Sequence, residues 1–216
     1  MLKRWLGDVK ESEFDTIEGN HNPVIIAGFG RVGQIVGRML TLRHIPFTAL
    51  ERSPEQVDIV RRFGNRVYYG EPARLDLLRA AHADKAKMFV LAIDNAEDSL
   101  KIAQVVRRHF PQLDIYATAR DRFHALRLLD VGVKYFVRET FHSSLKLSEV
   151  VLQGLGDSQE RAMETVSVFA AFDEELLQKQ QAVQHDESKL IQSAKEARAE
   201  LQSLLESGVD GEIRIS

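Results

Sequence analysis

A glycine-rich loop near the start of the sequence has the residue types needed to hold a phosphate. The string Gly28-Phe29-Gly30-Arg31-Val32-Gly33 follows a short apolar run, Val24–Ala27, and precedes a helical pattern of apolar residues. In a G-x-G-x-x-G loop the first glycine makes the tight turn, the second lets backbone approach a phosphate, and the third lets helix and strand pack closely. The N-terminus of the following helix presents N–H groups to the anion. The loop therefore predicts a nucleotide-binding site.

An acidic residue supports the same prediction. Glu51 ends the predicted strand Phe47–Glu51, 18 positions after Gly33. At this place in a dinucleotide-binding fold, a carboxylate usually accepts ribose hydroxyls. The Glu51 carboxylate favours a nucleotide whose ribose has a free 2′-hydroxyl, and it therefore disfavours NADP as the ligand. Arg52 could stack on adenine or face water, and the sequence leaves both open.

Two arginines lie on one face of the helix that follows the loop. Arg31 and Arg38 are seven residues apart, which is two helical turns. Their guanidinium groups could hold a carboxylate or a phosphate bidentately, or they could form a solvent-facing basic stripe. The spacing alone favours the stripe slightly.

The motifs of several enzyme classes are missing. Gln34-Ile35 stands where a P-loop requires Lys-Ser/Thr, no tyrosine has a lysine four residues later, and there is no G-x-S-x-G or H-E-x-x-H. The absence of cysteine excludes disulfides, thiolate catalysis and Cys-ligated metals. The seven histidines show no metal-ligand spacing. We therefore predict neither catalytic nor metal-ligating residues, and a nucleotide site without catalytic groups suggests a sensor.

The elements that must position the loop alternate regularly between strand and helix. The predicted strands are Val24–Ala27, Phe47–Glu51, Arg66–Tyr69, Lys87–Asp94, Asp114–Ala119 and Lys134–Val137. The predicted helices between them are Pro54–Phe63, Arg74–Ala81, Ala96–Phe110 and Arg122–Val131, with a further helix directly after the glycine loop. Such alternation predicts an α/β fold, a Rossmann-like doubly wound parallel sheet of six strands.

Only helices are expected after the sixth strand. One covers residues 140–155, and a second has Val166, Phe169, Phe172 and Leu176 on one face. A heptad seam follows at Leu190, Ala194, Ala197, Leu201 and Leu204, which could pack within the chain or pair with a second copy. The expected organisation is a linker at 1–22, a Rossmann domain at 23–139, a helical extension at 140–206 and a flexible tail at 207–216.

Composition and charge narrow the functional classes. The chain has 216 residues and a net charge of −3, which argues against non-specific nucleic-acid binding. Residues 157–216 carry 13 acidic and 6 basic side chains, and the first 156 residues are mildly basic. This balance suits an anionic small ligand in the first part of the chain, although solvated surfaces would explain it as well. No apolar run approaches the ~20 residues that span a bilayer.

Several strings resemble a known family. The run from Val24 to Gln34 resembles the first strand and loop of the RCK or KTN domains that regulate potassium transport. Four further strings are similar to the Kef branch, the glutathione-gated potassium efflux systems: Val67-Tyr68-Tyr69-Gly70-Glu71 with Arg74 and Asp76-Leu77-Leu78, then Ala92-Ile93-Asp94, Ala119-Arg120-Asp121 and Arg138-Glu139-Thr140-Phe141. The similarity covers residues 22–175. Residues 1–22 look like the linker that joins this family's membrane antiporter domain to its regulatory domain.

The resemblance implies a function that composition does not. In Kef systems, regulatory domains on the cytoplasmic face of the bacterial inner membrane form a homodimer and hold potassium–proton antiport closed while glutathione is bound. Glutathione S-conjugates of toxic electrophiles displace glutathione and open efflux. AMP or NAD(H) occupies the Rossmann site, and a quinone-reductase-like ancillary subunit is a possible partner.

The resemblance also implies roles for individual residues. The nucleotide site would include Gly28, Phe29, Gly30, Arg31, Val32, Gly33, Glu51, Arg52, Gly70, Glu71 and Asp94. The glutathione site would include Arg38, Arg138 and Asp173, and Phe63 matches the aromatic that an adduct must move to open the system. Asp173 is a departure, because Kef members can carry asparagine there. An ionised aspartate cannot donate a hydrogen bond and repels a carboxylate, but it can still accept from amino or amide groups.

Two other functions fit part of the pattern. A stand-alone nucleotide-sensing subunit of a potassium uptake system would bind NAD(H) without glutathione and would not depend on Arg138. An NAD-dependent oxidoreductase would show turnover, but the catalytic pair and a substrate domain are missing from the sequence.

Overall fold

The computed structural model describes residues 14–17, 21–64 and 66–208. The chain forms two compact units, which are described separately. The first comprises residues up to Thr118 together with Val131–Val137, and the second comprises Ala119–Asp130 and residues from Arg138 onward. The helix at 122–130, which the sequence assigns to the Rossmann domain, thus belongs to the second unit.

A six-stranded sheet in the order β3-β2-β1-β4-β5-β6 organises the Rossmann fold. Its strands are β1 Val24–Ala27, β2 Phe47–Glu51, β3 Tyr68–Tyr69, β4 Met88–Leu91, β5 Asp114–Ala119 and β6 Tyr135–Arg138. The registered pairs of β1 with β2 and β4, of β2 with β3, and of β4 with β5 are all parallel. The predicted doubly wound parallel sheet is therefore confirmed.

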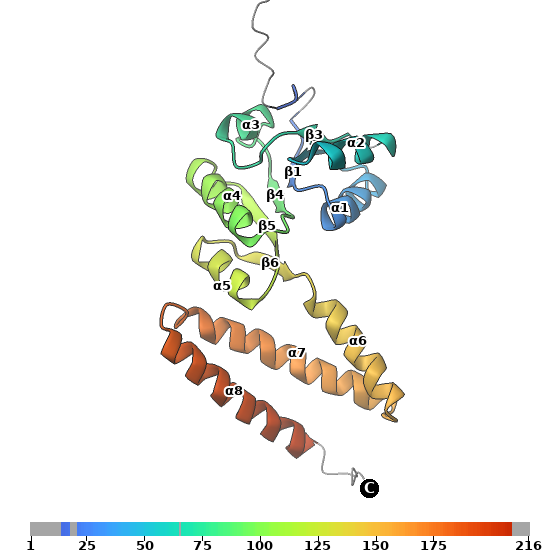
Figure 1. Ribbon diagram of the computed structural model, residues 1–216, viewed down its shortest axis with the longest axis vertical. Coiled ribbons are helices and arrows are strands. Elements are labelled where there is room, and N and C mark those ends of the chain that lie inside the picture. The colour runs from blue at the N-terminus through green and yellow to red at the C-terminus, as the bar shows by residue number, and fades with distance from the viewer. Residues whose placement is uncertain (1–13, 18–20, 65, 209–216) are drawn as a thin grey trace, which may run out of the picture. The chain divides into compact units, whose positions relative to one another are not determined.

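Four helices of the first unit connect these strands: α1 Arg31–Leu42, α2 Pro54–Arg62, α3 Leu75–Ala80 and α4 Ala96–His109. Helices α1 and α2 lie on one side of the strands, and α3 and α4 lie on the other (Figure 1). The strand order reverses at β1 and β4, because the chain returns from β3 to the far side of β1. The carboxyl end of β1 is thus a topological switch point, where ligands of open α/β sheets bind.

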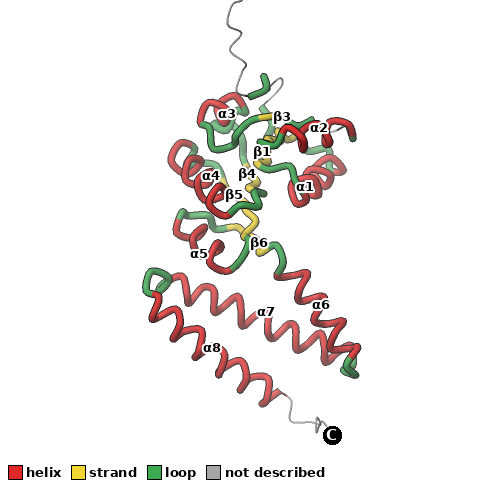
Figure 2. Tube along the Cα trace, viewed as in Figure 1, coloured by secondary structure: helices red, strands yellow, loops and turns green. Residues whose placement is uncertain are grey.

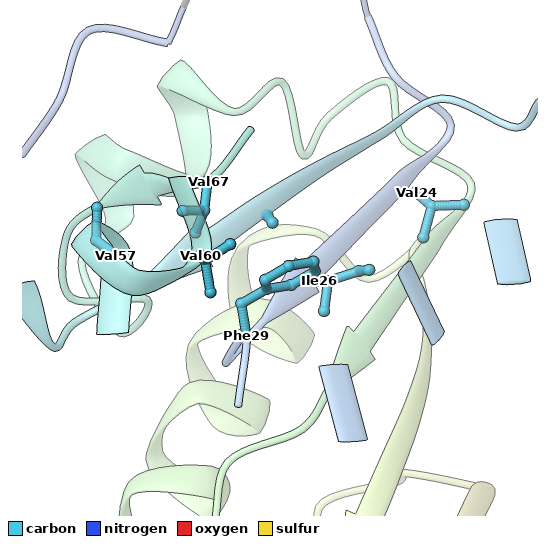
Figure 3. Packing of buried hydrophobic residues seen from close by; sticks show 7 residues of the cluster. Val24, Ile26, Phe29, Val57, Val60 and Val67 are labelled. Carbon is cyan, nitrogen blue, oxygen red and sulfur yellow. The ribbon is translucent and has the colours of Figure 1, made fainter. Parts of the chain in front are cut away.

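One part of the core of the first unit forms where α1 and α2 cover the sheet, and buried residues of α3 and α4 form another. Ile26 of β1 and Phe29 of the glycine loop are buried together with Val57 and Val60 of α2 and with Val67 (Figure 3). All four residues of β1 are buried, as expected for a central parallel strand covered on both faces. Burial of Phe29 in this core fixes the start of the loop.

The second unit is helical. It contains α5 Arg122–Asp130, α6 Phe141–Gly154, α7 Gln159–Gln181 and α8 Glu187–Gly208. Ser158 caps α7 by accepting a hydrogen bond from the Arg161 N–H at 3.2 Å. Helix α7 packs against both α6 and α8 (Figure 2). Ala197 of the heptad seam is buried within the chain, so at this residue the seam packs in cis.

The observed elements differ from the predicted ones mainly at their ends. Strand β3 is only Tyr68–Tyr69, and β4 ends at Leu91, although the Ala92 N–H still donates to Ala27 O at 2.8 Å. Within the predicted linker, Asp15 forms hydrogen bonds with Tyr69 of β3. Residues 1–13 and 18–20 of the linker, and residues 209–216 of the predicted tail, lie outside the described residues. Among the described helices, none is both long and apolar enough to span a membrane.

Candidate functional site

The three glycines of the loop have different surroundings. Gly28 has a φ of +87°, and a Cβ added there would lie 2.3 Å from the carbonyl oxygen of Ala92. A Cβ on Gly33 would lie 2.1 Å from the carbonyl oxygen of Gly28. A Cβ on Gly30 would meet no described atom within 4 Å. Gly28 and Gly33 are thus required by the fold, whereas Gly30 faces open space where a ligand can approach the backbone.

Helix α1 begins in a way that suits an anion. Gly30 is its N-cap, which provides no side-chain cap, and the first turn contains no acidic residue. The first N–H groups of a helix have no partner within the helix and carry the positive end of its dipole. The start of α1 can therefore donate hydrogen bonds to a phosphate.

Glu51 joins the glycine loop to the end of β2. Its Oε2 accepts the Phe29 N–H at 2.8 Å, and its Oε1 accepts the Ser53 N–H at 2.9 Å. The side chain is buried, so these hydrogen bonds hold the carboxylate beside the loop. Because each carboxylate oxygen can accept more than one hydrogen bond, Glu51 still has capacity for ribose hydroxyls.

The charged residues around this edge of the sheet pair with one another. Arg52 lies 2.5 Å from Asp98 and 3.8 Å from Glu71. Arg31 and Asp94 approach to 3.8 Å and are both exposed. The sequence left open whether Arg52 stacks on adenine or faces water. In the structure its guanidinium instead pairs with carboxylates of α4 and of the loop after β3.

A cavity of about 550 Å³ lies within the second unit. Its walls come from α6 and α7, with the segment after β5 and the end of β6 at one side. Apolar side chains alternate with hydroxyl and charged groups, and the lining residues are Arg120, Asp121, Arg122, Arg138, Thr140, Phe141, Ser144, Leu145, Ser148, Leu152, Thr165, Val166, Phe169 and Asp173. This volume and lining suit a small ligand that has both an apolar part and an anionic group.

Asp173 pairs with two arginines of the cavity lining. Arg138 Nη2 lies 2.5 Å from Asp173 Oδ2, and Arg122 forms an ion pair with Asp173 Oδ1. The Arg138 guanidinium also lies over the Phe141 ring, 3.7 Å from its centre, in a cation–π contact. The structure thus brings together two of the three residues predicted to bind glutathione.

The third residue predicted to bind glutathione, Arg38, and the predicted gating aromatic, Phe63, are in the first unit. Arg38 is an exposed residue of α1, and its Nε donates to Gln34 O at 3.4 Å. Phe63 follows α2 and is 81% exposed. Phe63 is therefore not a packing residue within the first unit.

Sequence reasoning missed Arg122, whose partner Asp173 is 51 positions away. Arg122 directly follows Ala119-Arg120-Asp121, one of the strings that resemble Kef systems, and this adjacency was the available signal. It also missed Ser53, whose backbone N–H donates the second hydrogen bond to the Glu51 carboxylate. Over residues 14–17, 21–64 and 66–208, no group of three His, Asp or Glu side chains is arranged to bind a metal.

The sheet order and the loop after β1 define the class of protein: a Rossmann-type domain with a nucleotide-binding loop, followed by a helical extension. Residues 24–139 match the TrkA-N domain family, and residues 143–213 match the C-terminal domain of the potassium efflux system KefB. The chain belongs to the Kef-type regulatory domains of potassium transport.

Solved structures agree with this assignment. The AMP-bound form of the Kef CTD from Shewanella denitrificans is 42% identical, with a TM-score of 0.68, and the match covers 75% of this chain and 99% of that one. The TrkA-N domain of the inner membrane protein YbaL from Escherichia coli is 27% identical, with a TM-score of 0.55, over 61% of this chain and 97% of that one. The GsuK channel bound to NAD shares the fold at 20% identity, with a TM-score of 0.55, over 61% of this chain and 24% of the channel.

Proposed function

We propose that this chain senses ligands and gates a potassium/proton antiporter without catalysing a reaction. Glutathione in the second unit keeps the antiporter closed, glutathione S-conjugates open it, and AMP or NAD(H) occupies the Rossmann site. The observation that carries this proposal is the cavity in which Arg122 and Arg138 both contact Asp173 and apolar side chains complete the lining. A regulator that senses only nucleotide does not need such a site.

The glycine loop supports the nucleotide part. Gly30 leaves the start of α1 open, and Glu51 is held within reach of the same loop. A phosphate bound by backbone N–H groups and a ribose bound by a carboxylate are the contacts of an adenine nucleotide in this fold. The AMP in the Shewanella denitrificans relative supports the same ligand class here.

The arginine cavity supports the glutathione part. Glutathione carries two carboxylates, and an S-conjugate adds an apolar group that matches the apolar lining. Arg138 and Asp173 lie at this cavity, and the resemblance adds Arg38 and the gating aromatic Phe63 of the first unit. Closed and open states respond to the two ligands only if each state prefers one of them.

Exposed apolar residues support a homodimer. Leu147 and Val151 of α6, and Leu155 directly after it, are each at least half exposed and lie on one helix face. We propose that this face binds a second copy of the chain. We also propose that a membrane antiporter domain is attached to the chain at the cytoplasmic face of the bacterial inner membrane. A quinone-reductase-like subunit completes the proposed assembly.

Calorimetric titration tests the proposal. The unaltered chain is expected to bind AMP or NADH, and to bind glutathione in competition with a bulky S-conjugate. The double variant Arg38→Ala/Arg138→Ala should bind neither glutathione nor the S-conjugate, and it should still bind the nucleotide. Arg62→Ala, at an exposed position of α2, is the control and should keep all ligands.

The opposite pattern would identify a different regulator. Binding of AMP or NADH with no heat from glutathione or its conjugate would support a nucleotide-only subunit of a potassium system. Oxidation of NADH by the purified chain in the presence of a substrate would support the oxidoreductase instead.

A further inference from the structure

Two arginines of the cavity lining, Arg122 and Arg138, already contact a carboxylate of the chain. Asp173 reaches Arg122 with one oxygen and Arg138 with the other, at 2.5 Å for Arg138. The side chains are 24% exposed for Arg122, 9% for Arg138 and 13% for Asp173. The three groups are thus largely removed from water, where charge–charge interactions are stronger than at the surface.

Both arginines are also held by uncharged groups. Arg122 Nη1 donates to Gln180 Oε1 at 2.9 Å, and Arg138 stacks over the Phe141 ring. Glu174 is a weaker second partner for Arg138, because its carboxylate is 3.7 Å away and 58% exposed. The positions of the two guanidinium groups therefore do not depend on Asp173 alone.

A ligand carboxylate would contact the same two guanidinium groups. Arginine binds a carboxylate through paired N–H groups, and Asp173 presents that chemical group from within the chain. We propose that Asp173 is an internal competitor, which a ligand carboxylate must displace from Arg122 or Arg138 before it binds. For the identity of the ligand, this inference rests on the glutathione function proposed above.

The competitor sets the selectivity of the site. With Asp173 in place, the two arginines and the aspartate carry one net positive charge, so the site favours a ligand with little net negative charge. Without it, the two arginines carry two positive charges, and small anions bind more readily. Asp173 is therefore a specificity-determining residue, and Arg122 is a further binding residue that acts with Arg138.

A role of Asp173 in binding glutathione, instead of competing with it, predicts the opposite change in glutathione affinity when Asp173 is replaced. If its carboxylate accepted the ammonium of glutathione, its loss would weaken binding. If it competes with the ligand, its loss strengthens binding. The sign of a single substitution therefore separates the two roles.

Asp173→Asn is the decisive variant, because it removes the charge and keeps the shape. We expect glutathione to bind about tenfold more tightly to this variant than to the unaltered chain in calorimetry. Glu175→Gln is the matched control, since it removes an exposed charge of the same helix whose partner is Lys179 and not an arginine of the cavity, and the glutathione affinity should stay within about twofold. If the unaltered chain binds glutathione, equal or weaker binding by Asp173→Asn would overturn the inference.

Sulfate tests Asp173 independently of glutathione. Sulfate should raise the melting temperature of Asp173→Asn by about 2–4 °C more than that of the unaltered chain, and Arg122→Met added to Asp173→Asn should abolish the difference. An equal sulfate effect in all variants would overturn the inference. If only sulfate distinguishes the variants and none binds glutathione, the glutathione function fails while the competitor role stands.

Should Asp173→Asn not fold, Asp173→Ser provides the same test. Serine removes the charge, leaves more room and can bond either arginine, so the same signs are expected for glutathione and sulfate. Circular dichroism establishes which variant is folded before titration, and a decrease in glutathione affinity in the folded variant contradicts the inference.

Discussion

At the scale of single residues, the glycine loop separates what the fold needs from what a ligand needs. A methyl group on Gly30 meets open space, whereas one on Gly33 meets the Gly28 carbonyl at 2.1 Å. We expect Gly30→Ala to keep the melting temperature of the unaltered chain and to lose most of its affinity for AMP, because the methyl group occupies the approach to the backbone N–H groups. Calorimetry with AMP, together with thermal unfolding monitored by circular dichroism, measures both effects.

Gly33→Ala is the matched control for this experiment. Its methyl group must displace backbone, and we expect it to lower the free energy of unfolding by about 1–3 kcal/mol. Normal AMP binding by Gly30→Ala would show that the phosphate does not approach that residue. Normal stability of Gly33→Ala would show that the contact between α1 and β1 is looser than the structure indicates.

Residues close in sequence were easier to interpret than residues paired across the fold. The separate roles of Gly28, Gly30 and Gly33 follow from one local motif, and the surroundings of each agree with them. Arg52 binds Asp98, which is 46 positions away, so its partner could not be inferred from its neighbours. The same holds for Arg122 and Asp173, because an ion pair between distant positions depends on how the helices pack.

At the scale of elements, the short strand β3 is supported by a segment predicted to be only a linker. The Asp15 N–H donates to Tyr69 O at 3.0 Å, and the Tyr69 N–H donates to Asp15 Oδ2 at 2.5 Å. Arg61 contacts the same carboxylate at 2.6 Å and also donates to Val67 O. Residues 14–17 thus lie along the edge of the sheet, next to Gly70 and the candidate nucleotide site.

Asp15→Ala should therefore destabilise the first unit. It leaves the Tyr69 N–H and Arg61 without this carboxylate, and we expect a loss of about 1–2 kcal/mol in the free energy of unfolding by urea. Asp58→Ala, at an exposed position of α2, should change stability by less than about 0.5 kcal/mol. Equal effects of the two substitutions would show that the segment does not stabilise β3.

Alternation of strands and helices predicted the parallel sheet, but not all element ends. Val24–Ala27 is a continuous apolar run, and its strand was predicted to the residue. Arg66–Tyr69 was predicted as a strand of four residues, and only Tyr68–Tyr69 pairs with β2, at Leu50 and Glu51. Hydrophobic pattern reports burial, and Val67 is buried in the core without belonging to the strand, which explains the overestimate.

At the scale of the whole molecule, the two faces of α6 have different surroundings. One face, with Leu145 and Leu152, lines the cavity of the second unit. The other face contains Leu147 and Val151, and Leu155 continues it at the C-cap; these residues are 65%, 51% and 81% exposed. An apolar stripe along about two turns of a helix is costly to leave in water, and in a two-fold dimer the same stripe can pack against its own copy.

Leu147→Glu/Val151→Glu tests the proposed homodimer. Two charges within the apolar stripe should weaken self-association by about a hundredfold, because neither carboxylate finds a partner when it is buried. Sedimentation equilibrium measures the dissociation constant, and circular dichroism shows whether helix content is preserved. His142→Glu, which adds a carboxylate at an exposed position of the same helix, should leave the dissociation constant unchanged. A dimer that survives the double substitution would place the interface elsewhere, whereas a monomeric unaltered chain would mean that gating does not use a dimer formed by this part of the protein.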